Sequence, residues 1–143
     1  MQMTPMIAVH LTTALAALVI GPVALWARRG LGPRFATAQR PRLHRAAGYA
    51  WVTLMLLTAF SALFIRDFQL PNIAGYTPIH LVVPYTLVGL FLAFRRLFRG
   101  DVAGHRKSML GLYLGACIGA GLFTLLPQRF LGQLVWGQWL GLL

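Results

Sequence analysis

Long apolar stretches alternate with short basic segments along the chain. A hydrocarbon core of ~30 Å needs roughly 20 apolar helical residues, with about 17 as the lower limit. Four stretches reach that length, and they cover about residues 5–26, 46–65, 78–94 and 108–126. The pattern predicts an all-α integral membrane protein, a four-helix bundle forming a single domain over residues 1–143.

The C-terminal segment 130–143 is apolar but too short to span a membrane. It carries Trp136 and Trp139 together with Gln133 and Gln138. Indole rings favour the headgroup region. We therefore expect a short interfacial helix at the C-terminus.

Composition supports a membrane protein, and the distribution of charge predicts its topology. The chain is 58% hydrophobic and 10% charged, with a formal net charge of +11. Basic residues gather in two loops, one between the first two spans and one between the last two. They are Arg28, Arg29, Arg34, Arg40, Arg42 and Arg45 in the first loop, and Arg95, Arg96, Arg99, Arg106 and Lys107 in the second. Basic loops stay cytoplasmic, so we expect both chain ends outside and no nucleic-acid partner. Membrane lipid is the expected partner of this charge.

Targeting signals and cysteines add little to the prediction of function. The N-terminus lacks the positive region of a signal peptide, so we expect the first span to be retained. Cys117 is the single cysteine, and no Cys-x-x-Cys-His sequence is present. Covalent attachment of a c-type haem is therefore excluded.

The four histidines belong to a pattern that occurs twice. Each copy has a histidine, an apolar span, an arginine pair, a loop, a His-Arg dipeptide and a second apolar span. The copies run through His10, Arg28-Arg29 and His44-Arg45, and through His80, Arg95-Arg96 and His105-Arg106. Each half crosses the membrane twice, which predicts two parallel helix-pair repeats related by an axis along the membrane normal.

This symmetry predicts two facing pairs of histidines. In an up-down-up-down bundle, spans one and three are diagonal, and so are spans two and four. His10 then lies opposite His80 near the outer surface, and His44 lies opposite His105 near the inner surface. Ionisable groups inside a membrane are expensive and are candidates for function. His44 and His105 lie at helix N-termini, where a solvated histidine is the simpler interpretation.

Haem b fits such pairs better than other metal groups do. Zinc needs four ligands in one small shell, and the two pairs are separated by more than ~20 Å of helix. Copper fits less well, because no thiolate or methionine set accompanies the histidines. A proton relay lacks a carboxylate within any span. Two histidines fill both axial positions of haem iron, which suits electron transfer.

Other residues would complete one or two haem sites. Arg45 and Arg106 could bind propionates through charge-assisted contacts. Gly48 leaves room beside His44, and Gly111 and Gly115 could form a flat wall for a porphyrin. Close helix packing is the alternative interpretation of the ridge formed by Gly111, Gly115 and Gly119.

The chain also resembles a known family. The motifs that carry the resemblance are Val9-His10-Leu11, Gly21-Pro22-Val23, Leu43-His44-Arg45-Ala46-Ala47-Gly48-Tyr49, Pro78-Ile79-His80-Leu81, Gly104-His105-Arg106-Lys107-Ser108-Met109 and Gly111-Leu112-Tyr113. They resemble a family of small bacterial membrane proteins catalogued as domain of unknown function 2306. The resemblance covers the four spans and implies a four-helix protein of the bacterial inner membrane, with no established activity.

Two looser resemblances concern function. The histidine design is similar to that of cytochromes of the b561 type, which stack two haems across a helical bundle. Their helix number and histidine positions differ from those expected here. Another four-helix, histidine-bearing group is associated with cytochrome oxidase maturation.

The sequence thus leads to three functional hypotheses. The first is electron transfer through bis-histidine haem b, with quinone or a membrane oxidoreductase as partner. The second is a haem or copper oxidase assembly factor, or a haem-handling factor. The third is an accessory structural subunit of a membrane complex or oligomer. Whether the chain is an enzyme stays open.

Overall fold

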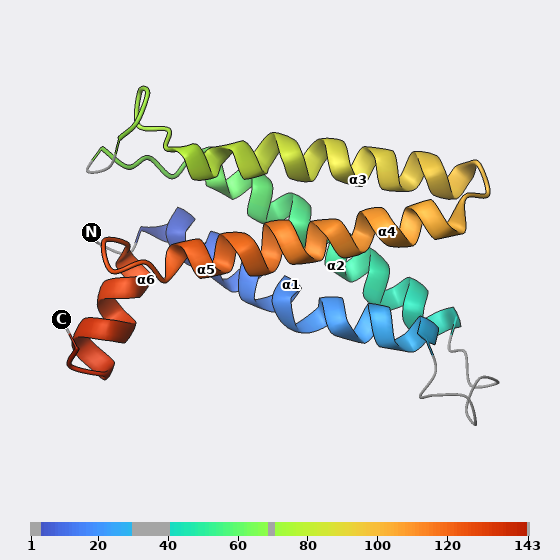
Figure 1. Ribbon diagram of the computed structural model, residues 1–143, viewed down its shortest axis with the longest axis horizontal. Coiled ribbons are helices and arrows are strands. Elements are labelled where there is room, and N and C mark those ends of the chain that lie inside the picture. The colour runs from blue at the N-terminus through green and yellow to red at the C-terminus, as the bar shows by residue number, and fades with distance from the viewer. Residues whose placement is uncertain (1–3, 30–40, 69–70, 143) are drawn as a thin grey trace. The chain divides into compact units, whose positions relative to one another are not determined.

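The computed structural model describes residues 4–29, 41–68 and 71–142, and the described chain is mostly helical (Figure 1). Two compact units divide the chain, Pro5–Ile65 and Arg66–Leu143. Each unit is built around one helical hairpin. The two units correspond to the two halves of the sequence repeat, and each is described below by itself.

The first unit is a hairpin of α1 (Pro5–Arg29) and α2 (Pro41–Ala62). Both helices begin with proline, whose fixed φ and missing N–H suit the first helical position. Helix α2 begins five residues before the start of the predicted span 46–65 and ends three residues before the end of that span. The bounds differ because hydropathy indicates only which residues suit the hydrocarbon core. Pro41, in contrast, begins the helix among polar residues.

Small side chains let α1 and α2 approach closely. Ala17 is completely buried, and Ala27, Ala47 and Ala59 are at most 8% exposed. Membrane helices associate through such small residues, because lipid leaves little hydrophobic gain from burying larger ones. Thr58 Oγ1 donates a hydrogen bond of 2.9 Å to Thr13 Oγ1 across the same interface.

The second unit begins with a loop and the short 3₁₀ turn η2 (Pro78–Leu81), which leads into α3 (Val82–Phe98). Pro84 lies in the first turn of α3, where its missing N–H leaves no helical hydrogen bond broken. The chain then reverses at Gly100, whose φ of 78° lies in the left-handed region.

A single long helix follows this turn. It consists of α4 (Val102–Leu112), the wider π-helical segment η3 (Tyr113–Gly119) and α5 (Ala120–Thr124). Asp101 is the N-cap residue, and its side chain accepts a hydrogen bond of 2.7 Å from the Gly104 N–H. A carboxylate thereby caps the N-terminus of α4. Its negative charge also interacts favourably with the positive end of the helix dipole.

A tyrosine of α3 occupies the glycine ridge of this long helix. The Tyr85 hydroxyl donates to the Gly111 carbonyl at 3.1 Å. A Cβ at position 115 would lie 3.0–3.3 Å from the Tyr85 hydroxyl and ring. The ridge therefore packs a neighbouring helix, as the alternative interpretation of Gly111 and Gly115 predicted. Porphyrin contact by these glycines stays a prediction.

The C-terminal segment is helical, as predicted, from α6 (Phe130–Gly132) through the π-helical η4 (Gln133–Trp139). It turns away from the end of α5 (Figure 1). The Trp136 indole N–H donates to the Leu125 carbonyl at 2.6 Å and fixes the segment against the preceding turn. Its expected place in the membrane interface stays a prediction.

Within the described residues, three helical stretches are long and apolar enough to cross a membrane: Pro5–Ala27, Pro78–Phe98 and Val102–Thr124. Helix α2 falls outside this set, although the sequence predicts a span there. Its predicted span includes Leu63, Phe64 and Ile65, which lie beyond the end of the helix at Ala62. Its first turn instead holds Arg42 and Arg45.

The contact between Tyr85 and the ridge predicts unequal effects of two glycine substitutions. Gly115→Leu should destabilise the second unit by about 1–3 kcal/mol, because the new side chain overpacks against the tyrosine ring. Gly121→Leu is the matched control, since a Cβ there meets nothing within 4 Å. Denaturation in detergent, followed by circular dichroism, measures both. Equal midpoints for the two variants would contradict the packing described here.

Candidate functional site

His44 lies in the first turn of α2 and is hydrogen bonded to α1. Its Nδ1 is 2.8 Å from the carbonyl oxygen of Ala24. A carbonyl only accepts hydrogen bonds, so Nδ1 carries the proton. The side chain is half-buried, and the hydrogen bond joins the two helices near their connected ends.

His105 makes the same kind of hydrogen bond in the second unit. Its Nδ1 donates to the Ala93 carbonyl of α3 at 3.0 Å. The Phe94 ring lies edge-on to the imidazole, with 6.3 Å between ring centroids. The two His-Arg dipeptides of the repeat are therefore equivalent in structure as well as in sequence.

These hydrogen bonds fix the tautomer of both rings. With the proton on Nδ1, the neutral ring presents Nε2 as an unprotonated nitrogen. Histidines that bind metals through Nε2 commonly donate Nδ1–H to a backbone carbonyl in this way. His44 and His105 thus have the tautomer and the orienting contact that an axial ligand needs.

His10 takes part in a polar cluster between α1 and α2. Its Nδ1 lies 3.0 Å from the Thr58 carbonyl and 3.2 Å from Ser61 Oγ. Ser61 is 6% exposed and also donates to the Thr58 carbonyl. Such hydrogen bonds hold membrane helices together. This contact gives His10 a structural role within its own hairpin.

His80 has a different hydrogen-bonding pattern. The Thr77 N–H donates to His80 Nδ1 at 3.1 Å, as one half of a capping box at the start of η2. His80 Nδ1 also lies 3.1 Å from the Thr77 carbonyl, so either tautomer of the ring finds a partner in this turn. The contact with Thr77 lies within one turn and, unlike those of His44 and His105, does not join two helices.

The two predicted histidine pairs each take one member from each unit. The pairing of His10 with His80, and that of His44 with His105, therefore stay predictions. Among the described residues, no group of three or more His, Cys, Asp or Glu side chains could hold a metal ion. Each predicted haem site has two histidines, which is fewer than the three residues of such a group.

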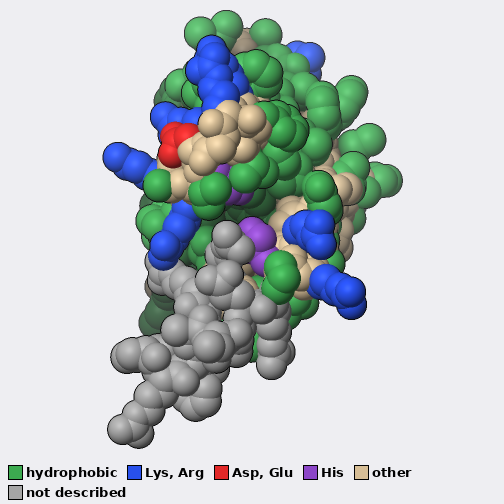
Figure 2. Space-filling view, turned by 90° about the vertical axis from the view of Figure 1, so that its right-hand side faces the viewer, with side chains coloured by type: hydrophobic (Ala, Val, Ile, Leu, Met, Phe, Trp, Pro, Cys, Tyr) green, Lys and Arg blue, Asp and Glu red, His purple; other side chains and the backbone are tan. Residues whose placement is uncertain are grey.

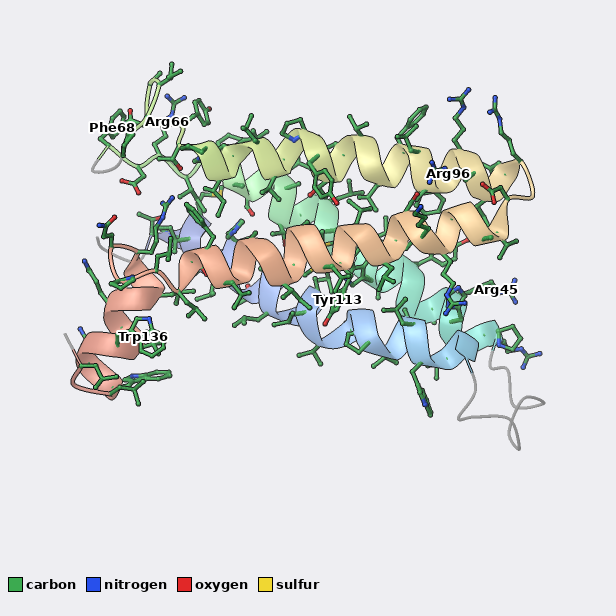
Figure 3. The ribbon with its side chains drawn as sticks, viewed as in Figure 1. Arg45, Arg66, Phe68, Arg96, Tyr113 and Trp136 are labelled. Atoms are coloured by element: carbon green, nitrogen blue, oxygen red, sulfur yellow. The ribbon has the colours of Figure 1, made fainter. Side chains whose placement is uncertain are left out.

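The predicted propionate partners Arg45 and Arg106 are both exposed, next to His44 and His105 in sequence. A third arginine, Arg96, has a structural role that the sequence did not reveal (Figure 3). Its Nη1 donates to Ser108 Oγ at 2.6 Å and to the Gly104 carbonyl at 3.3 Å. Arg96 thereby joins α3 to α4 beside His105.

The surroundings of His44 leave room for a ligand. A Cβ at Gly48, one turn further along α2, would meet nothing within 4 Å. Trp51 is 3% exposed, and its buried indole N–H has no hydrogen-bond partner among the described residues. Residues 44, 48 and 51 share one face of the helix because of their spacing. Buried donors without a partner are rare and call for an explanation.

A polar network at the other end of the second unit was not predicted. Arg129 forms an ion pair of 3.0 Å with Asp67, and each side chain is 14% exposed. Arg129 Nη2 also donates to Thr77 Oγ1 at 3.5 Å, and its guanidinium lies 4.8 Å from the centre of the Phe123 ring. The network links the loop before η2 to the C-terminal segment. Asp67 and Asp101 are the only two acidic residues of the sequence, a signal that could have drawn attention to it.

The loop in this network has a defined shape. Asp67 N–H donates to the Gly75 carbonyl at 2.9 Å, and Gly75 has a φ of 85°. A Cβ at Gly75 would approach the Phe68 ring within 2.9 Å. The Arg66 guanidinium donates to the Ala74 carbonyl and lies 4.7 Å from the centre of the Tyr76 ring.

Comparison with known proteins identifies the family. The family model for a predicted membrane protein, DUF2306, matches residues 7–140. The chain belongs to this family. The match confirms the resemblance drawn from the histidine motifs, and it also includes most of the C-terminal segment, which those motifs did not reach. No curated protein and no solved structure matches the chain.

The ion pair predicts that Asp67→Asn loosens the described part of the loop, residues 66–68 and 71–77. A hydrogen bond to a charged group contributes ~1.5–3 kcal/mol, so amide hydrogen exchange in the loop should accelerate roughly tenfold or more. Asp101→Asn is the matched control, because asparagine caps a helix about as well as aspartate. Hydrogen exchange followed by mass spectrometry distinguishes the two variants. Unchanged exchange in Asp67→Asn would mean that the ion pair does not hold the loop.

Proposed function

We propose that this protein binds haem b between His44 and His105 and transfers electrons across or along the bacterial inner membrane. The observation that carries the proposal is a hydrogen bond that recurs in both units: a histidine near the start of the second helix of each hairpin donates from Nδ1 to a carbonyl of the first helix. The proposal takes α2 as a fourth span and assembles both hairpins into one bundle, with basic loops in the cytoplasm and both termini outside.

The residues around His44 fit such a group. Gly48 leaves open space one turn along α2, where a bulkier residue would project. Trp51 supplies a buried donor that still needs an acceptor. Arg45 and Arg106 supply exposed guanidinium groups next to the two histidines, and carboxylates such as propionates are their usual partners.

Haem held by His44 and His105 would supply one-electron chemistry. The protein would have to hold the two imidazoles in place. The Ala24 and Ala93 carbonyls fix the ring orientations and, in the neutral ring, place the proton on Nδ1 and leave Nε2 as the ligating nitrogen. Quinone or a membrane oxidoreductase would be the electron partner.

The inner pair receives more support than the outer pair. His80 Nδ1 contacts the Thr77 backbone within its own turn, whereas His44 and His105 are each bonded to the preceding helix. His10 is hydrogen bonded within the cluster of Thr58 and Ser61. One haem at the inner pair is therefore the form of the proposal that the contacts favour.

Haem titration of the purified protein tests this proposal. We expect a low-spin bis-histidine spectrum, with a Soret band that sharpens on reduction. His44→Ala and His105→Ala should each abolish that spectrum. Each should also weaken haem binding by more than ~10–100-fold, which is the effect of losing a residue hydrogen bonded to a metal ligand.

His80→Ala and His10→Ala are the matched controls and should retain the spectrum. A spectrum lost only in these two variants would move the haem to the outer pair. A protein that binds no haem, although circular dichroism shows it to be helical, would exclude the proposal. Binding far below one haem per chain in native membranes would favour a haem-handling or assembly factor instead.

A further inference from the structure

The turn between α3 and α4 carries a cluster of exposed cations. Arg95 and Arg99 come from the end of α3, and Arg106 and Lys107 come from the first turns of α4. All four side chains are exposed. Lys and Arg side chains stand out from the molecule when it is viewed from the side on which this turn lies (Figure 2).

Nothing within the described residues neutralises these charges. No hydrogen bond or ion pair of the described chain engages the charged groups of Arg95, Arg99, Arg106 or Lys107. Asp101 lies in the same turn, but its carboxylate accepts the Gly104 N–H as the cap of α4. The remaining acidic residue, Asp67, is paired with Arg129.

Apolar side chains surround the same turn. Phe98 is 83% exposed, and Val102 is 48% exposed. Phe98 is the last residue of the apolar stretch Pro78–Phe98, and Val102 is the first of the stretch Val102–Thr124, both of which are long enough to cross a membrane. The turn therefore belongs at the level where acyl chains meet headgroups, with the apolar residues at the edge of the hydrocarbon.

The depth of the cations determines the kind of partner. Arg106 and Lys107 lie four and five residues into α4, which corresponds to about 6–8 Å along the axis from Val102. Long basic side chains at such a depth extend toward the interface to reach polar groups. The nearest anions at that level are lipid phosphates, and anionic headgroups attract clustered lysine and arginine by about 1 kcal/mol per residue.

We propose that the α3–α4 turn is a binding site for the headgroup of an anionic phospholipid. Arg95, Arg99 and Lys107 hold the phosphate and its net negative charge, and Phe98 contacts the upper acyl chain. Arg96 is not part of this site, because it is bonded to Gly104 and Ser108 and keeps the two helices in register. Arg106, which the haem proposal assigns to a propionate, is left out of the site, so the lipid proposal does not rest on haem binding.

Native mass spectrometry of the detergent-purified protein tests the site. The protein is titrated with phosphatidylglycerol, with phosphatidylcholine, or with glycerol 3-phosphate. We expect phosphatidylglycerol to be retained at least fivefold more strongly than phosphatidylcholine, and glycerol 3-phosphate not to compete at equal concentration. The double variant Arg99→Gln, Lys107→Gln should lose this preference.

Two control variants keep the test decisive. Arg66→Gln removes a positive charge from the loop that precedes η2, and it should retain phosphatidylglycerol as the unchanged protein does. Arg99→Lys with Lys107→Arg keeps both charges and should restore retention. Equal retention of the two lipids, or an unaltered preference in the double variant, overturns the proposal. Competition by glycerol 3-phosphate would show a soluble phosphate site and would also overturn it.

Discussion

Each hairpin is joined by a polar contact between its two helices. A hydrocarbon environment offers no water, so a polar side chain must find its partner within the protein. In both hairpins a histidine near the start of the second helix donates to a carbonyl of the first helix. That hydrogen bond joins the helices near their connected ends. It also leaves the opposite ring nitrogen unprotonated, which is the basis of the proposed haem site.

Packing along the hairpins follows from small residues, in two different ways. In the first unit, buried alanines let α1 and α2 approach. In the second unit, Gly115 and Gly111 receive the ring and hydroxyl of Tyr85. Leu112 likewise fills the space that a side chain at Gly89 would need. Such contacts replace the hydrophobic driving force that is weak between helices in lipid.

Basic side chains at the two ends of the second unit differ in whether they have an acidic partner. At the loop before η2, Arg129 is paired with Asp67 and is largely shielded from solvent. At the α3–α4 turn, basic side chains remain exposed and without acidic partners in the described structure. The first arrangement fixes a loop to the C-terminal segment. The second leaves charge available for an anion outside the protein, which is why we assign that turn to a lipid headgroup.

The sequence by itself determined the class of the protein, its apolar helices, the repeat and the family, because these follow from composition and periodicity along one chain. Helix ends could not be read in this way: α2 begins at Pro41 and ends at Ala62, where local caps and prolines compete with hydropathy. Only the tertiary structure decided the roles of individual polar residues. Either ring nitrogen of a histidine can carry the proton, and it was the position of the Nδ1 partner, on the preceding helix or within the same turn, that distinguished His44 and His105 from His80.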